Sequence, residues 1–303
     1  METYRVPGKL LLTAEYVVLR GVTALAVPTR AGQELRRYPA PADQTCFLQW
    51  VAYDQAGKPW LDIQFGPRLE VKKATDIQAA KQLQLLLRFA ARYGTFPQEP
   101  FRAETHLQFD RSWGLGSSST LVALIARFTH CDAMTLHRHA YPGSGYDVAT
   151  AMEGRALKYK LAESQPQWRP FVPPPVWQDT FLVYRGRKQD SQAEVARFKD
   201  THVSASTLKR LNELSLGLSG QMKINQLAAL LQEHERLLSA MLQHQAVQLD
   251  YPDCPAQLKS LGAWGGDFMW AVPRTPGEKE AVQRYFEALP EVQIFPFSAI
   301  ADI

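Results

Sequence analysis

The sequence contains few cysteines and no long uninterrupted apolar run. Cys46, Cys131 and Cys254 stand far apart with no Cys-x-x-Cys pair, which argues against a disulfide framework or a zinc site and favours a reducing compartment. No apolar run approaches the ~20 residues that a membrane-spanning helix needs, so we expect no membrane span. The first residues lack the basic and apolar regions of a signal peptide, and we expect a cytoplasmic protein.

An excess of charge of one sign is also missing. The formal net charge is +4, from 34 Lys and Arg against 30 Asp and Glu in 303 residues, and the basic residues are scattered. A nucleic-acid-binding protein usually gathers its basic residues on one face, so we expect no nucleic-acid partner. The hydrophobic fraction of 46% and charged fraction of 21% are typical of a globular protein with a large core. We expect a small-molecule substrate and a monomer or homodimer.

Five prolines within residues 165–175 interrupt the sequence pattern. Prolines this close together do not fit a helix or a central strand, so we interpret the segment as a surface connection near a domain boundary. Strand-like and helix-like patterns mix on both sides of it. The sequence therefore predicts an α+β protein with two domains, residues 1–170 and 171–303.

Periodicity predicts individual elements within these domains. Apolar residues at helical spacing follow Asp76, a suitable N-cap, and Gly94 is a suitable end for that helix. Apolar and polar residues alternate over residues 101–109, which predicts a half-buried strand. Further strands are predicted at 47–51, 60–65, 180–184 and 292–297, a glycine-interrupted strand region at 261–272, and further helices at 120–128, 193–214, 225–243 and 276–289.

A loop rich in glycine and serine lies between the predicted strand 101–109 and the predicted helix 120–128. Glycines let backbone N–H groups approach a phosphate, the helix N-terminus adds donors, and serine hydroxyls bind phosphate or Mg²⁺. The loop does not end in the Gly-Lys-Ser/Thr of the common P-loop. A tight turn with a serine N-cap is an equally good interpretation. The candidate residues are Gly114, Leu115, Gly116, Ser117, Ser118 and Ser119.

Three further segments contain candidate residues. Lys9 precedes an apolar run and could reach a phosphate as a point charge, although an exposed lysine after a turn is the simpler interpretation. Asp147 follows a glycine-containing turn and could accept a hydroxyl proton, although a helix N-cap is simpler. A third segment has glycines ahead of a strand, which suggests close backbone approach to a ligand or a structural bend. Its glycines are Gly262, Gly265 and Gly266.

The order and spacing of these four segments resemble the motifs of the GHMP kinases, which include galactokinase and the homoserine, mevalonate and phosphomevalonate kinases. PGKLLLTAEYVVLRG resembles their first motif, WGLGSSST their second and LGAWGGDFMWAV their third. GSGYDVATA resembles the segment with the catalytic aspartate in the mevalonate-pathway members. The resemblance runs from residue 7 to about residue 272, and is nearest to a bacterial subgroup named for a Gly-Tyr-Asp-Ile-Ala signature, with Val148 in place of isoleucine.

The resemblance implies a two-domain α+β fold that binds ATP in the interdomain cleft and uses Mg²⁺. The implied activity is transfer of the γ-phosphoryl group of ATP to a metabolite hydroxyl or phosphate, with phosphomevalonate or mevalonate as acceptor. It implies that Lys9 lies near the transferred group, that Asp147 acts on the acceptor and that Ser118 binds Mg²⁺. It places Gly114, Leu115, Gly116, Ser117, Ser118, Ser119, Gly262, Gly265 and Gly266 around the nucleotide, and Lys9, Glu15, Ser144, Gly145, Tyr146 and Lys188 around the acceptor.

The sequence departs from the family pattern at several positions. Ala14 and Trp264 replace usual glycines, and the segment after Ser119 lacks the glutamate that gives mevalonate kinases a second Mg²⁺ ligand. Glu15, Glu153 or water would then fill that position. Three alternatives remain open: a homoserine-type or other GHMP metabolite kinase, a diphosphomevalonate decarboxylase, whose first motif we do not find, and a non-catalytic ligand-binding homologue.

Overall fold

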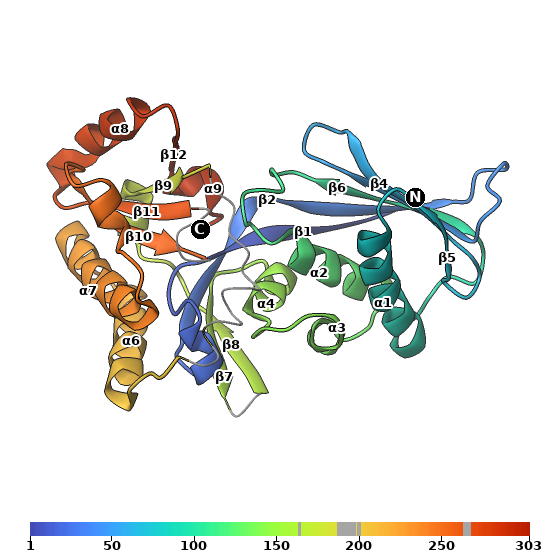
Figure 1. Ribbon diagram of the computed structural model, residues 1–303, viewed down its shortest axis with the longest axis horizontal. Helices are drawn as coiled ribbons and strands as arrows, with labels where there is room; N and C mark the ends of the chain where they lie inside the picture. The colour runs from blue at the N-terminus through green and yellow to red at the C-terminus, as the bar shows by residue number, and fades with distance from the viewer. Residues whose placement is uncertain (163–164, 187–197, 199–200, 263–267) are drawn as a thin grey trace. The chain divides into compact units, whose positions relative to one another are not determined.

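The computed structural model describes every residue except 163–164, 187–197, 199–200 and 263–267 (Figure 1). The chain forms two compact units, each assembled from separate segments. The α+β class is confirmed. The predicted domain division at residue 170 stays a prediction. Unit 2 combines segments from both sides of that residue. Unit 1 comprises Met1–Gly8, Ala31–Arg111 and Leu115–Gly154, and unit 2 comprises Lys9–Arg30, Ser112–Gly114 and Arg155–Ile303.

Unit 1 contains a mixed β-sheet with the strand order β5-β4-β3-β6-β2. Only the β3–β6 pair is parallel among these neighbours. In β6 every second residue from Phe101 to Leu107 is buried, which confirms the predicted half-buried strand. The strands are β2 (Ala24–Pro39), which continues into unit 1 from unit 2, β3 (Leu48–Tyr53), β4 (Pro59–Phe65), β5 (Val71–Ala74) and β6 (Phe101–Leu107).

Four helices of unit 1 lie on one face of this sheet (Figure 1). The first begins after Asp76, whose carboxylate accepts hydrogen bonds from the backbone N–H groups of Gln78 and Ala79, and it ends at Gly94. Both predicted ends of this helix are therefore confirmed, because the cap chemistry is local to the sequence. The helices are α1 (Ile77–Tyr93), α2 (Ser117–Thr129), α3 (Ala133–Ala140) and α4 (Tyr146–Glu153).

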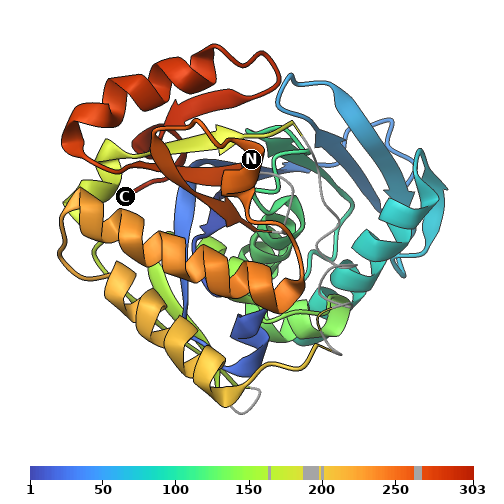
Figure 2. The same cartoon turned by 60° about the vertical axis from the view of Figure 1, so that its left-hand side comes forward.

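Unit 2 contains an antiparallel sheet with the strand order β10-β11-β9-β12. Two long helices, α6 and α7, pack against each other, and α7 also packs against β10 and β11 (Figure 2). A buried apolar cluster joins the sheet to α8, with Val183, Leu258, Met269 and Phe286 among its members. The elements are β9 (Phe181–Tyr184), α6 (Ala205–Leu218), α7 (Ile224–Leu242), β10 (Ala256–Leu261), β11 (Phe268–Pro273), α8 (Lys279–Glu287) and β12 (Gln293–Pro296).

The proline-rich segment differs from its prediction. Pro166 and Pro170 lie in β8 (Gln165–Pro170), an edge strand that pairs with β7 (Leu157–Ala162), so the expected surface connection is wrong for this part. An edge strand tolerates proline because only half of its backbone groups need a partner. The remaining elements are β1 (Glu2–Leu11), α9 (Phe297–Ile300) and the short 3₁₀ helices η1 (Val17–Arg20), η2 (Pro175–Asp179), η3 (Val247–Asp250) and η4 (Pro276–Glu278).

Two other sequence expectations concern the helix predicted over residues 193–214 and membrane-spanning segments. In the stretch 193–214, which was predicted as one helix, Phe198 is helical, residues 201–204 are not, and α6 begins at Ala205 after Ser204, whose hydroxyl accepts a hydrogen bond from the backbone N–H of Thr207. Residues 193–197 and 199–200 lie outside the described part of the chain. Within the described part, no helix combines the length and apolar character needed to cross a membrane.

Candidate active site

Lys9 lies near the end of β1 and reaches the predicted phosphate loop within unit 2. Its Nζ atom donates a hydrogen bond of 2.8 Å to the carbonyl oxygen of Gly114, a residue 105 positions away in the sequence. The lysine side chain is half-buried. The contact places a positive charge at the first glycine of the loop, so two of the four sequence motifs meet in space.

The residues that enter the loop are held by the sheet of unit 2. The hydroxyl groups of Ser112 and Tyr184 are hydrogen-bonded at 2.8 Å. The Trp113 ring packs against Tyr184, Phe268 and Phe295 with ring centroids 5.6, 5.7 and 5.5 Å away. Aromatic rings at this spacing bury a large area and fix one another's orientation. Ser112 and Trp113, the two residues directly before the loop, therefore both have defined partners in unit 2.

The second part of the loop opens helix α2 in unit 1. Gly116 is the N-cap and has a φ of 93°, a left-handed conformation that favours glycine, and no side chain caps the helix. The serine N-cap interpretation is therefore wrong. The hydroxyl of Ser119 donates a 2.9 Å hydrogen bond to the Gly116 carbonyl oxygen. The first N–H groups of a helix have no acceptor inside the helix, so this end suits an anion.

A tyrosine that the sequence analysis did not select connects this helix end to Asp147. The Tyr141 hydroxyl is hydrogen-bonded to the side chains of Gln82 and Ser118, and it lies within the electrostatic range of the Asp147 carboxylate. Burial raises the pKa of the Tyr141 hydroxyl, the two hydrogen bonds lower it and Asp147 raises it, with a net rise. The phenol is therefore protonated at neutral pH. No local pattern marks a tyrosine after a helix as a site residue.

Asp147 lies in the first turn of α4, and its carboxylate accepts a 3.0 Å hydrogen bond from the backbone N–H of Val148. The helix N-cap is Gly145, with a φ of 82°, so the N-cap interpretation of Asp147 is wrong. A Cβ atom at Gly145 would lie 2.5 Å from Met134 Cε and 3.2 Å from His137 Cδ2. The backbone conformation thus favours glycine at this position, and a Cβ atom would also require the end of the Met134 side chain to shift.

The other predicted acceptor-binding residues lie in different surroundings. Ser144 is buried, and its Oγ lies 3.5 Å from the backbone nitrogen of Tyr146. The Glu15 carboxylate forms an ion pair with Lys259 inside unit 2, where the exposed fractions of the two side chains are 1% and 0%. Burial raises the pKa of Glu15 and Lys259 opposes that rise. Contact between Glu15 and an acceptor stays a prediction.

The third motif is only partly described. Gly262 follows β10 and has a φ of 71°. Gly265, Gly266 and Lys188 lie outside the described residues, so their predicted roles are untested. Across the described part of the chain, no group of three or more His, Cys, Asp or Glu side chains could hold a metal ion. Ser118 remains the predicted magnesium ligand.

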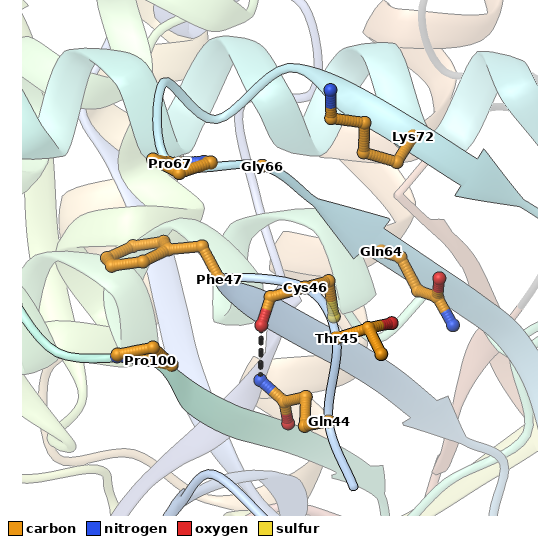
Figure 3. A pocket seen from close by; sticks show the side chains of 9 residues that line it. All are labelled: Gln44, Thr45, Cys46, Phe47, Gln64, Gly66, Pro67, Lys72 and Pro100. Atoms are coloured by element: carbon orange, nitrogen blue, oxygen red, sulfur yellow. Dashed lines mark hydrogen bonds between the residues drawn. The ribbon is translucent and has the colours of Figure 1, made fainter.

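A cavity of about 430 Å³ lies elsewhere in unit 1 (Figure 3). Pro100, in its wall, precedes the first residue of β6, whereas the phosphate loop follows the last residue of that strand. The cavity is therefore separate from the candidate active site. Its lining residues are Gln44, Thr45, Cys46, Phe47, Gln64, Gly66, Pro67, Lys72 and Pro100.

Comparison with known proteins identifies the fold. No protein-family model and no curated protein matches the sequence. Phosphomevalonate kinase from Streptococcus pneumoniae, in complex with phosphomevalonate and AMPPNP, superposes with a TM-score of 0.73 at 16% identity over 97% of this chain and 98% of that chain. Mevalonate kinase from Methanococcus jannaschii gives a TM-score of 0.70 at 14% identity over 97% and 96%.

Galactokinase from Lactococcus lactis, complexed with galactose, is similar with a TM-score of 0.66 at 13% identity over 100% of this chain and 93% of that chain. At these identities the likeness shows the fold alone. The GHMP kinase fold that the sequence motifs implied is thus confirmed.

Proposed function

We propose that the protein is an ATP-dependent kinase that transfers the γ-phosphoryl group of ATP to a small metabolite. The observation that carries this proposal is the 2.8 Å hydrogen bond from Lys9 Nζ to the Gly114 carbonyl oxygen. It brings a cation from the first sequence motif to the glycine-rich loop of the second. The GHMP kinase fold supports the same activity.

The loop residues fit the phosphates of a nucleotide. Gly114 and Gly116 have φ values of 66° and 93°, and the N-terminus of α2 follows directly. Backbone N–H groups at such a turn form a favourable site for phosphate oxygens. Magnesium commonly takes one or two protein ligands and fills its other positions with phosphate oxygens and water, so the single hydroxyl of Ser118 is sufficient. Bound magnesium would supply charge neutralisation for the phosphates.

Each catalytic residue has a defined role in this proposal. Lys9 neutralises charge on the transferred phosphoryl group, where a positioned cation lowers the barrier most effectively. Asp147 orients the acceptor hydroxyl and accepts its proton. Tyr141 positions the Ser118 hydroxyl through their hydrogen bond.

We propose phosphomevalonate or mevalonate as the acceptor. The segment GSGYDVATA, which contains Asp147, supports this choice through its resemblance to the mevalonate-pathway kinases. Similarity to the fold of Streptococcus pneumoniae phosphomevalonate kinase is consistent with it.

The test is release of ADP from Mg-ATP in the presence of mevalonate, phosphomevalonate, homoserine, galactose or no acceptor. Turnover with either mevalonate-pathway compound and with neither of the others supports the full proposal. Turnover with homoserine or galactose retains the kinase assignment and rejects the acceptor. Binding of AMPPNP without turnover on any acceptor rejects these four acceptors, and absence of nucleotide binding rejects the kinase.

The role of Asp147 is tested by Asp147→Asn, which keeps the size of the side chain and removes its basicity. We expect turnover to fall about 10²–10⁴-fold, the usual contribution of a general base, with AMPPNP affinity nearly unchanged. Asp43→Asn, at an exposed turn of the same unit, is the matched control and should leave turnover unchanged. Full activity of Asp147→Asn would remove Asp147 from the mechanism.

A further inference from the structure

The turn that follows β1 has an unfavourable backbone conformation. Ala14 has a φ of 62° and Tyr16 a φ of 63°, and neither residue is glycine. Side chains with a Cβ atom are strained in this left-handed region, and such strain persists only where surrounding contacts enforce it. Lys9 lies on β1, a few residues before this turn in the sequence. The conformation of the turn therefore influences the position of the Lys9 backbone, from which the side chain extends.

Buried polar contacts enforce this conformation within unit 2. The backbone N–H of Ala14 donates a 3.2 Å hydrogen bond to His234 Nε2 on α7. Thr13 Oγ1 accepts a 2.9 Å hydrogen bond from the backbone N–H of Leu25. Glu15, between the two strained residues, forms its ion pair with Lys259 on β10. Every residue from Thr13 to Glu15 thus has a buried partner.

The same cluster also holds the start of the third motif. Lys259 Nζ donates a 2.8 Å hydrogen bond to the carbonyl oxygen of Ser260. The carboxylate of Glu235, on α7, accepts hydrogen bonds from the backbone N–H and the hydroxyl of Ser260 at 3.2 and 3.0 Å. Gly262 follows two residues later. A single buried network therefore connects the first motif with the third.

Stability alone is a poor explanation for this network. A fully buried ion pair loses the hydration of both charges, and apolar residues of similar volume often stabilise a protein as well or better. The pair here connects a strained turn to a neighbouring strand, and the structure places Lys9 at the other end of the segment, on Gly114.

We propose that Lys259 is a positioning residue of the active site, which holds the turn Thr13–Tyr16 through Glu15 and so fixes Lys9 at Gly114. The proposal rests on the proposed kinase function for its effect on turnover. Its effect on the turn is independent of that function. Lys259 itself contacts Glu15 and Ser260, and it acts on the reacting groups through them.

The test compares Lys259→Met, Glu15→Gln and the double variant Glu15→Gln/Lys259→Met with the wild type. Each single variant leaves one buried polar group without its partner, so both should unfold at lower temperature. The double variant removes both charges and should recover most of the melting temperature. We nevertheless expect its turnover to remain about 100-fold below wild type, because loss of positioning slows transfer without loss of the fold. Lys279→Met, which removes an exposed ion pair with Asp179 in unit 2, is the matched control.

A second measurement follows the turn without reference to activity. The backbone N–H of Val18 donates to the Ala14 carbonyl oxygen at 3.0 Å, and that of Leu12 donates to the Leu25 carbonyl oxygen at 2.8 Å. We expect hydrogen exchange at Leu12, Val17 and Val18 to be at least about tenfold faster in the double variant, because local opening becomes easier. Exchange in α8 should not change.

The outcomes separate this proposal from the proposed function. A stable double variant with wild-type turnover would overturn the positioning role, and so would unchanged exchange at the turn. Faster exchange with reduced turnover supports it. If the wild type turns over none of the acceptors, hydrogen exchange at the turn and the affinity for AMPPNP still test the positioning role of Lys259. Faster exchange with weaker AMPPNP binding supports the role of Lys259, and unchanged values reject it.

Discussion

Lys9 donates a hydrogen bond from its Nζ to the carbonyl oxygen of Gly114 over 2.8 Å, although 105 residues separate them in the chain. A carbonyl oxygen satisfies one donor of the ammonium group and leaves its positive charge at the loop. The same group can therefore hold the loop conformation and attract phosphate.

The first prediction concerns this lysine. Lys9→Met keeps the length of the side chain and removes its charge, and we expect turnover to fall about 10²–10³-fold, as when a preorganised charge stabiliser is lost. The melting temperature should change little, since the side chain is only half-buried. Lys81→Met, at an exposed position of α1, is the control. Unchanged kinetics in Lys9→Met would place the lysine outside the site.

The second prediction concerns Tyr141. Tyr141→Phe removes the hydroxyl that is hydrogen-bonded to Ser118 and Gln82. Loss of one such bond costs about 1 kcal/mol, so we expect the KM for Mg-ATP to rise roughly 5-fold. Because Tyr141 acts through Ser118, the effects of Tyr141→Phe and Ser118→Ala should not be additive in the double variant. Additive effects would show that the two hydroxyls act independently, and Tyr93→Phe on the surface of α1 serves as the control.

The third prediction is a dependence of stability on pH. Burial raises the pKa of Glu235 from 4.5 to about 7, against the opposing effect of Lys259. An acid with a raised pKa binds its proton more tightly in the folded state. Its contribution to stability is fully present below pH 4.5 and is lost as the pH rises through 7, by at most about 3 kcal/mol.

Glu235→Gln isolates this contribution because glutamine stays neutral at every pH. The free energy of unfolding of Glu235→Gln minus that of the wild type should increase between pH 5 and pH 8, as measured by urea denaturation. Three neighbouring groups, Lys259, Glu15 and His234, are present in both proteins, so their own titration largely cancels in the difference. Burial raises the pKa of Glu15 and lowers the pKa of His234. A difference that does not change with pH would contradict the raised pKa of Glu235.

The fourth prediction tests the strain at Ala14. Glycine adopts the observed φ of 62° without steric cost, so Ala14→Gly should stabilise the protein by about 1 kcal/mol. The same substitution at Ala91, on the exposed face of α1, should destabilise it by about 1 kcal/mol, because glycine weakens a helix interior. Denaturant titration of both variants measures the sign of each change in the free energy of unfolding. Equal destabilisation by Ala14→Gly and Ala91→Gly would mean that the turn is not strained.

Local sequence patterns determined much of the secondary structure. Asp76 and Gly94 end α1 where they were predicted to, because an N-cap carboxylate and a terminal glycine act on backbone groups a few residues away. The alternation over Phe101–Leu107 identified β6, since one face of that strand is buried. The long strand β2 and the edge strand β8 were missed. β8 contains prolines that argue against a strand unless its place at the edge of the sheet is known.

The sequence by itself determined which motifs are present and in what order, and that order implied the fold. Only the tertiary structure decided which of their residues meet. Contacts such as Lys9 with Gly114 and Glu15 with Lys259 join segments far apart in the chain, and they depend on how strands and helices pack. Tyr141 is part of the site for the same reason: its hydroxyl reaches Ser118 across the packing of α2 and α3, a distance that no spacing in the sequence encodes.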